Sequence, residues 1–259
     1  MKRKAILIES SNVAGETDLP GARVDIDNWQ TFLKSDLGGR WHESEIQVLR
    51  KPDSNVVTNF LTIYSDSYCF LAFSGHGCDG SVVLNDYEKN CAVGILKPKS
   101  EKGTLIIDSC RGAQEAERAI FNRSIITLNA SLDQSINEAL FTNAIQARMA
   151  EFSSRDGIKK VATVSDFIVN WAAALKASKK GIVEMLSCSK GQAAGENPRS
   201  GGHYTSLLMH SAKQWEARYT AEKIHTTKDA HDYAAAILPQ QQTPEYSPSW
   251  LEFPFAIKA

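Results

Sequence analysis

A histidine and a cysteine stand just beyond two apolar runs, and together they could form the reactive pair of a thiol enzyme. Tyr68–Phe73 leads into Ser74-Gly75-His76-Gly77, and Thr104–Ile107 leads into Asp108-Ser109-Cys110-Arg111-Gly112. A thiol becomes a strong nucleophile when an imidazolium or a helix N-terminus stabilises its thiolate. His76 and Cys110 are therefore the candidate catalytic residues, as proton carrier and nucleophile.

The two apolar runs predict how these residues meet. Each run is short and bounded by small residues, which is typical of a buried strand in a parallel sheet. In open α/β sheets, ligands bind beyond the carboxyl ends of such strands. Neighbouring strands would thus bring the imidazole and the thiol to one edge. Taken singly, a buried cysteine and a loop histidine are simpler interpretations, but their coincidence favours catalysis.

The same two turns could supply an oxyanion hole. Because Gly77 has no side chain, its backbone can approach a substrate closely. The backbone N–H groups of Gly77 and Cys110 would then donate hydrogen bonds to the oxygen of a tetrahedral intermediate.

Strand and helix patterns alternate along the chain. Apolar runs predict strands at 4–9, 45–50, 68–73, 104–107, 124–128 and 181–186, and a small hairpin made of 81–84 and 91–96. Helical spacing of apolar residues predicts helices at 21–37, 55–65, 113–120, 131–152, 165–177, 204–218 and 228–237. A loop at 240–248 then leads to a last apolar run at 250–257. This order implies an α/β fold with a mostly parallel sheet and helices on both faces.

The composition is that of a soluble globular protein. The chain has 259 residues, 42% of them hydrophobic and 23% charged, with a formal net charge of −1. This balance gives no reason to expect nucleic acid or a membrane surface as a partner. The apolar run at 5–8 is too short for a signal peptide or a membrane span. Because no low-complexity segment or long linker divides the chain, we expect a single domain over 1–259.

The cysteines do not have the pattern of a disulfide framework. There are five, an odd number, and no Cys-x-x-Cys pair occurs. We therefore expect reduced thiols and a cytoplasmic location. Zinc is an alternative use for His76, Cys78 and Cys110. Their spacing matches no common structural zinc site, so we expect neither a metal nor a cofactor.

The motifs around His76 and Cys110 resemble those of the caspase–metacaspase family of cysteine peptidases. Ser74–Gly77 is similar to the family's histidine motif, and Asp108–Gly112 is a hybrid of the metacaspase Asp-Ser-Cys and the caspase Cys-Arg-Gly. Weaker resemblances follow the family's order at Leu19–Asp25, Ser187–Glu196 and Gln241–Pro244.

This resemblance implies an architecture. The family's fold is a three-layer sandwich with a central, mostly parallel sheet of about six strands. Residues 1–150 would form the part that resembles the large caspase subunit and holds both catalytic residues. Residues 181–259 would form the part that resembles the small subunit.

The resemblance also bears on the P1 side chain of the substrate. Caspases bind aspartate there partly through an arginine, and Leu19 takes its place in this chain. Metacaspases bind Lys or Arg in an acidic S1 pocket, and the matching positions are Asp25, Ser74 and Asp108. Paired carboxylates attract a cationic side chain and accept several hydrogen bonds from it. The simpler alternatives for Asp25 are a surface helix acid or a structural ion pair with Arg23 or Arg111. For Asp108 the simpler alternative is a strand-end turn cap.

One feature departs from the pattern of many metacaspases, which carry an Asp-rich calcium site after the histidine motif. The segment 78–88 holds only three acidic residues. Since calcium takes six or more oxygen ligands, we do not expect calcium dependence.

A polar connection in the second half is a candidate processing site. The segment 149–161 contains Gly157 and the basic residues Arg155, Lys159 and Lys160. Nicking concentrates in exposed connections of small residues, and linkers after the cysteine are commonly processed in caspases. We therefore expect slow self-cleavage at Arg155 or at the Lys159-Lys160 pair.

The sequence thus predicts a cysteine endopeptidase that cleaves protein substrates after Arg or Lys. A catalytically silent homologue that serves as an interaction scaffold is the alternative. A nucleotide-binding protein has less support, because no glycine-rich phosphate motif follows the first strand. By analogy with the family, a regulatory protein partner would control the enzyme in a prokaryotic antiviral defence or programmed cell-death pathway, with a gasdermin-type pore-former as substrate.

Overall fold

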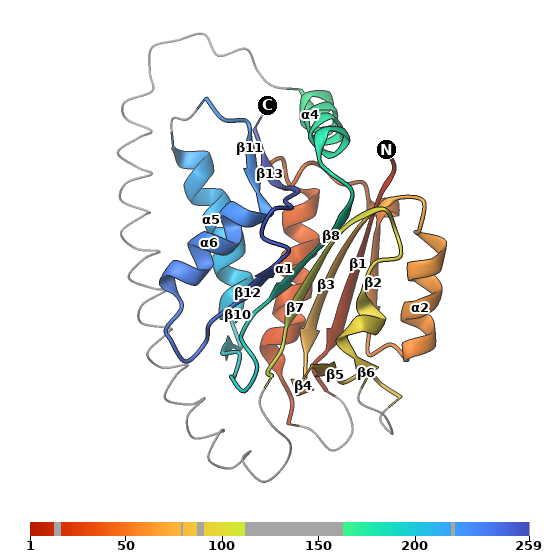
Figure 1. Cartoon of the computed structure of the whole chain (residues 1–259), viewed down its shortest axis with the longest axis vertical. Helices are drawn as coiled ribbons and strands as arrows, with labels where there is room; N and C mark the ends of the chain where they lie inside the picture. Colours follow the sequence, from red (N-terminus) through yellow and green to blue (C-terminus); the bar gives the residue numbers. More distant parts are fainter. Residues whose placement is uncertain (13–16, 79, 87–90, 112–162, 219–220, 259) are drawn as a thin grey trace.

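A six-stranded sheet forms the centre of the computed structural model, which describes residues 1–12, 17–78, 80–86, 91–111, 163–218 and 221–258 (Figure 1). The strand order is β12-β8-β7-β3-β1-β2. Five strands are parallel: β1 (Arg3–Ser10), β2 (Ile46–Arg50), β3 (Tyr68–Gly75), β7 (Lys102–Asp108) and β8 (Gly181–Leu186). The sixth strand, β12 (Glu245–Ser247), runs antiparallel to β8 at one edge.

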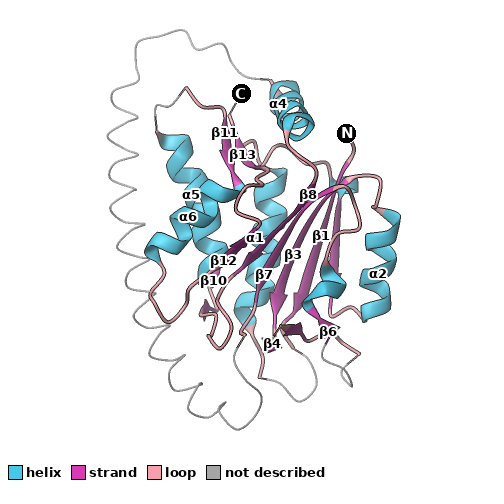
Figure 2. Cartoon of the chain, viewed as in Figure 1, coloured by secondary structure: helices cyan, strands magenta, loops and turns pink. Residues whose placement is uncertain are grey.

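Helices cover both faces of this sheet (Figure 2). The described helices are α1 (Pro20–Lys34), α2 (Ser54–Ile63), α4 (Val164–Ala177), α5 (His203–Ala217) and α6 (Thr227–Ile237), with short 3-10 helices η1 (Glu43–Glu45) and η2 (Val93–Leu96). One hydrophobic core packs α2 and η2 on one face, and the other core packs α1, α5 and α6 on the opposite face. The predicted three-layer α/β sandwich is confirmed.

The two cores follow from the alternation of side chains along each strand. Successive residues of a strand point to opposite faces. In β1, Ala5 and Leu7 belong to the core beneath α1, whereas Ile6 and Ile8 belong to the core beneath α2. Since both faces are buried, the central strands are continuous apolar runs, which made them recognisable in the sequence.

Three small sheets flank the main one. β4 (Gly77–Cys78), β5 (Ser81–Val82) and β6 (Cys91–Ala92) pair antiparallel directly after β3. β9 (Glu196–Asn197) and β10 (Gly201–Gly202) form a hairpin before α5. β11 (Ile224–Thr226) pairs with β13 (Pro254–Ile257) at the opposite end of the sheet from β4 (Figure 1).

Most predicted elements in the described residues are confirmed, and two are wrong. Residues 93–96 form the 3-10 helix η2 instead of continuing the predicted hairpin. The predicted loop at 240–248 contains β12, which the sequence did not reveal because this edge strand is short and lacks an apolar run. The elements predicted at 113–120, 124–128 and 131–152 lie outside the described residues.

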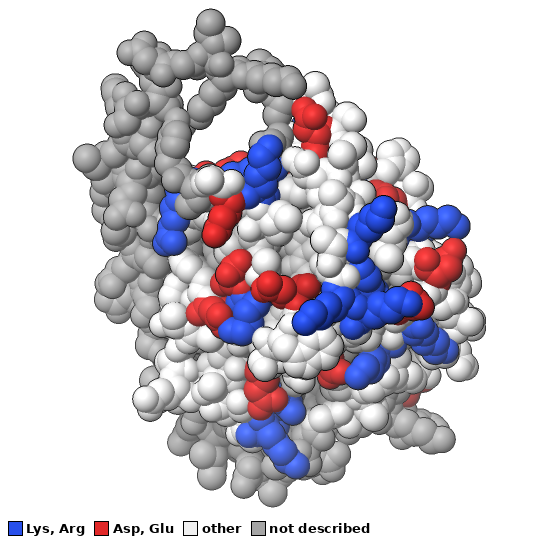
Figure 3. All heavy atoms as spheres, turned by 45° about the horizontal axis from the view of Figure 1, so that its top comes forward, with Lys and Arg blue, Asp and Glu red and all other residues white. Residues whose placement is uncertain are grey.

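Charges of both signs are interspersed on the surface. On the face in Figure 3, Lys and Arg side chains lie beside Asp and Glu side chains. Surface ion pairs such as Lys97–Glu184 (2.6 Å) and Lys180–Glu101 (2.7 Å) belong to this mixture. Within the described part of the chain, every helix is too short or too polar to cross a membrane.

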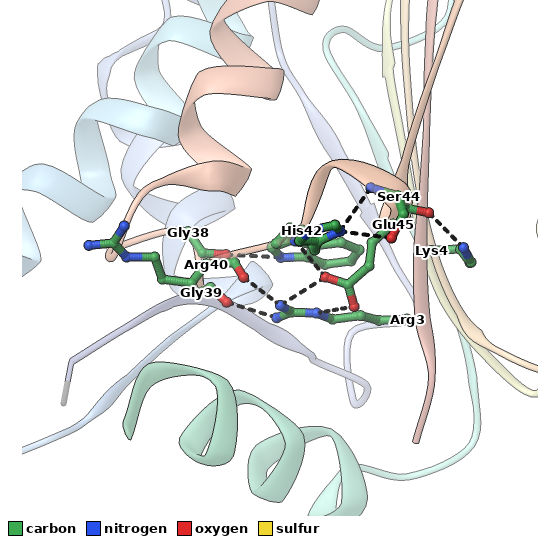
Figure 4. A network of polar contacts seen from close by, with 9 residues as sticks. Arg3, Lys4, Gly38, Gly39, Arg40, His42, Ser44 and Glu45 are labelled. Atoms are coloured by element: carbon green, nitrogen blue, oxygen red, sulfur yellow. Dashed lines mark hydrogen bonds and ion pairs between the residues drawn. The ribbon is translucent and has the colours of Figure 1, made fainter. Parts of the chain in front are cut away.

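A buried arginine ties the start of β1 to the loop that follows α1 (Figure 4). Arg3 is only 7% exposed, and its guanidinium donates to the carbonyl oxygens of Gly39 and Arg40, each at 2.9 Å. Its Nε donates to Glu45 Oε1 at 3.1 Å, and the guanidinium lies 4.6 Å from the centre of the Trp41 ring. Arg3 therefore fixes the connection between α1 and β2.

We expect Arg3→Met to lower the free energy of unfolding by about 3–5 kcal/mol, because it leaves Glu45 and two carbonyl groups without their buried partner. Lys2→Met is the control. Lys2 pairs with Asp66 at 3.2 Å on the surface, where the side chains are 76% and 63% exposed. Such a pair contributes about 1 kcal/mol or less. Urea unfolding followed by circular dichroism measures both, and equal effects would contradict the structural role of Arg3.

Candidate active site

The register of β3 and β7 brings the two candidate catalytic residues to one edge of the sheet. These strands are parallel neighbours, and Ser74 pairs with Asp108. His76 and Cys110 each follow this pair by two residues, so they leave the sheet at corresponding positions. Both lie beyond the carboxyl ends of the strands, which is where ligands bind in open α/β sheets.

Gly77 brings the histidine turn into contact with the cysteine turn. A Cβ atom at this position would lie 2.6 Å from Oγ of Ser109 and 3.0 Å from the carbonyl oxygen of Cys110. Any side chain at residue 77 would therefore push the two turns apart. The absence of a side chain permits the close backbone approach that an oxyanion hole built from Gly77 and Cys110 requires.

A backbone carbonyl orients the ring of His76. The ring Nε2 lies 2.6 Å from the carbonyl oxygen of Thr17. Because a carbonyl oxygen only accepts, Nε2 carries the proton and donates it to this hydrogen bond. In the neutral tautomer that has its proton on Nε2, the lone pair lies on Nδ1. No sequence signal could identify Thr17, since every residue has this carbonyl.

Cys110 is half-buried, and its thiol lies against a second loop. Its Sγ donates to the carbonyl oxygen of Ala194 at 3.7 Å. Burial raises the pKa of Cys110 to about 11, and the charges of Asp108 and Glu196 add to the rise. The thiol form of Cys110 is therefore favoured at neutral pH, because burial and negative neighbours both disfavour a thiolate.

The residues predicted to form the S1 pocket lie together behind the cysteine turn. Ser74 Oγ donates to Asp25 Oδ2 at 2.6 Å, and the N–H of Gly202 donates to Asp25 Oδ1 at 2.8 Å. Asp108 Oδ2 accepts from the N–H of Thr205 at 3.1 Å and from its hydroxyl at 2.7 Å. Asp25 and Asp108 are 1% and 5% exposed, respectively.

The contacts of both acids differ from those that the simpler interpretations require. The arginines nearest in sequence bind other acids: Arg23 pairs with Asp18, and Arg111 pairs with Glu245. Asp25 is thus no structural partner of either arginine. Asp108 accepts hydrogen bonds from the N–H and the hydroxyl of Thr205, so it caps the first turn of α5 instead of the turn that ends its own strand.

Gly201 and Gly202 lie against the carboxylates of Asp25 and Asp108, where a side chain would not fit. A Cβ atom at Gly202 would overlap Asp108 Oδ2 and lie 2.9 Å from Asp25 Oδ2. A Cβ atom at Gly201 would overlap Asp25 Oδ1, and the φ of +95° at Gly201 is one that glycine adopts most readily. The β9–β10 hairpin thereby places backbone, not side chain, beside both acids.

Comparison with known proteins identifies this arrangement. A family model described as the caspase domain matches residues 2–255. The chain belongs to the caspase family. The crystal structure of Caspase-1 from Spodoptera frugiperda is similar, with a TM-score of 0.57 and 13% sequence identity over 99% of this chain and 90% of that chain. At this identity the likeness shows the shared fold. No curated protein matches the sequence of this chain significantly.

The two buried acids of this caspase domain hold protons more tightly than usual. Burial raises the pKa of Asp25 well above its ordinary range, and the charge of Asp108 adds to the rise. Burial also raises the pKa of Asp108, although the hydrogen bonds from Thr205 oppose the rise. Two like charges in one buried space disfavour each other's ionisation.

Glu196 is a third acid of the site that the sequence did not single out. Its carboxylate accepts hydrogen bonds from the backbone N–H groups of Gly21 and Ala22, in the first turn of α1. Burial raises the pKa of Glu196 to about 7, and the charge of Asp108 contributes. Glu196 is the last residue of the segment Ser187–Glu196, which resembles the family. Only the folded chain places its charge near Cys110, where it raises the pKa of the thiol.

The sequence analysis also considered metal ligands, cysteines and processing residues. Among the residues that the structure describes, no three His, Cys, Asp or Glu side chains are grouped to hold a metal ion. Cys69, Cys78 and Cys188 are buried, and they form no disulfide bond among the described residues. The proposed processing residues Arg155, Lys159 and Lys160 lie outside the described residues.

Glu196 predicts a pH dependence of stability. Its pKa is about 7 in the folded chain against an ordinary value of 4.5, so the folded state binds more protons between these values. Its contribution to stability is then lost as the pH rises from about 4.5 to about 7. We expect Glu196→Gln to stabilise the chain more at pH 8 than at pH 5, as measured by urea unfolding. Glu252→Gln, at an exposed position, is the control, and equal slopes in the two variants would contradict this assignment.

Proposed function

We propose that this caspase-family chain is a cysteine endopeptidase that cleaves protein substrates after Arg or Lys. The observation that carries the proposal is the gathering of Asp25, Asp108 and Glu196 beside the turn of Cys110. An S1 pocket with several carboxylates favours a cationic side chain and repels an aspartate.

The proposed chemistry uses the pair of His76 and Cys110. Nδ1 of His76 takes the proton of the thiol, and the sulfur attacks the peptide carbonyl carbon. The N–H groups of Gly77 and Cys110 donate to the resulting oxyanion. The imidazolium gives its proton to the leaving amine, which leaves an acyl-enzyme. Water, deprotonated by His76, then releases the acid and restores the thiol.

Binding of the basic P1 side chain would also assist this chemistry. The negative charges of Asp108 and Glu196 help to keep the Cys110 thiol protonated. A guanidinium or ammonium placed against them would offset those charges and lower the pKa of the thiol. Recognition and activation of the nucleophile are thereby coupled through the same carboxylates.

The wider setting belongs to the same proposal. We expect one domain without a cofactor or calcium requirement, acting in the cytoplasm, with self-cleavage at Arg155 or Lys159-Lys160. A prokaryotic defence or cell-death pathway with a gasdermin-type protein substrate is in keeping with such an enzyme, by analogy with its family.

The first test concerns the catalytic pair. We expect Cys110→Ala and His76→Ala each to reduce turnover of an arginyl peptide by at least about a thousandfold, since the two residues act as a unit. Cys69→Ala, which removes a buried thiol at the start of β3, should retain activity. Wild-type turnover by a folded Cys110→Ala variant would reject the mechanism. A wild-type protein that cleaves no peptide would favour the scaffold alternative.

The second test concerns the P1 residue. We expect arginyl and lysyl fluorogenic peptides to be cleaved and aspartyl peptides to be poor substrates. Asp25→Asn and Asp108→Asn should each lower kcat/KM for the arginyl peptide. The expected loss of transition-state stabilisation is about 2–5 kcal/mol, the range for removing one partner of a desolvated charge pair. Asp27→Asn is the matched control, since Asp27 lies on the same helix but is exposed and pairs with Arg50. Faster cleavage of the aspartyl peptide would overturn the assignment.

A further inference from the structure

The loop between β8 and β9, residues 187–195, holds the cysteine turn through its backbone. Oγ of Ser187 accepts from the N–H of Ser109 at 3.2 Å and lies 3.3 Å from its carbonyl oxygen. The carbonyl of Gln192 accepts from the N–H of Arg111 at 2.9 Å, and the N–H of Gly191 donates to the carbonyl of Arg111 at 2.8 Å. The residues before and after Cys110 are thus both bound to this β8–β9 loop.

The β8–β9 loop also reaches the reactive groups. The carbonyl of Ala194 accepts the hydrogen bond from the Cys110 thiol. Glu196, which immediately follows the loop, adds its charge to the surroundings of the same thiol. A displacement of the loop would therefore change both the thiol and the acidic pocket.

One buried side chain joins the two ends of the β8–β9 loop. Gln242 is 0% exposed and belongs to the segment that precedes β12. Its Nε2 donates to the carbonyl oxygen of Ser187 at 3.1 Å, and its Oε1 accepts from the N–H of Gly195 at 3.0 Å. Because both ends of the amide are used, the side chain sets the distance between the two ends of the loop.

A second glutamine makes the reciprocal contacts. Oε1 of Gln192 accepts from the backbone N–H of Ser189 at 3.2 Å and from that of Thr243 at 2.6 Å. Its Nε2 donates to the carbonyl oxygen of Gln240 at 3.0 Å. The segment 240–243 and the β8–β9 loop are therefore bound to each other from both sides.

We propose that Gln242 is a positioning residue of this active site, which fixes the β8–β9 loop so that Ala194 and Glu196 stay in place beside Cys110. The proposal deepens the proposed function and rests on it for the effect on peptide cleavage. Gln242 touches neither the thiol nor the pocket acids in this role, and acts through the backbone of residues 187 and 195.

The test compares Gln242→Glu with Gln241→Glu. The first replaces the donor to Ser187 by an oxygen while keeping the shape of the side chain. The second makes the same change at the exposed neighbour in the same segment. We expect Gln242→Glu to lower kcat/KM for the arginyl peptide by about 10–100-fold, the loss that follows a misplacement of about 1 Å.

The rate at which Cys110 is alkylated separates the positioning role from a general loss of stability, which would expose all buried thiols alike. With iodoacetamide at pH 8 and mass spectrometry of the modified peptides, we expect Cys110 to react faster in Gln242→Glu, since the displaced loop no longer covers it. Cys69, which is 1% exposed, should remain unreactive and so reports on global unfolding. Gln242→Met keeps the volume and removes both hydrogen bonds, and it replaces Gln242→Glu should the added charge prevent folding.

The outcomes are separable from those of the proposed function. Faster alkylation of Cys110 alone, together with slower cleavage, supports the positioning role. An unchanged Cys110 rate, equal acceleration at Cys69, or the same effects in Gln241→Glu would overturn it. Should the wild type cleave no basic peptide, the proposed function fails, while the alkylation rates still decide whether Gln242 holds the loop over Cys110.

Discussion

The hydrogen bonding between β3 and β7 is the constraint on which the site depends. Its register pairs Ser74 with Asp108, and the residues beyond this pair inherit that alignment. A slip by one residue would turn every side chain of a strand to the opposite face. Ile107 would then leave the core beneath α2, and the alignment of His76 with Cys110 would be lost together with it. The core thus enforces the geometry of the site.

The site buries two acidic side chains close together, which disfavours their charged forms. Asp25 and Asp108 occupy one enclosed space, and each gains backbone or hydroxyl donors that only partly offset their loss of water. Buried titratable groups with shifted pKa values are typical of functional sites. The glycine pair that precedes α5 lets the backbone approach both carboxylates closely.

The central strands β1, β2, β3, β7 and β8 were predictable from the sequence, and so was the meeting of the candidate residues at one edge of the sheet, for a physical reason. Apolar runs mark strands buried on both faces, and the chemistry of a cysteine and a histidine at their ends limits the interpretations. Glu196, Thr17 and Gln242 escaped prediction because their roles depend on contacts that only the folded chain creates. The strand Glu245–Ser247 escaped because an edge strand of three residues needs no apolar pattern.

The bond between His76 and the carbonyl of Thr17 has a consequence for genetics. A main-chain group cannot be deleted by exchanging a side chain, so an alanine scan would leave the orienting oxygen of residue 17 intact. Variation at this position is therefore tolerated by the chemistry as long as the backbone keeps its path. Near residue 17, the N–H of Leu19 donates to the carbonyl of Ser11 at 3.0 Å and holds these two described residues together. Loss of the contact between His76 and residue 17 is therefore expected from insertions, deletions or proline substitutions that displace the backbone of residue 17, and not from shortening its side chain.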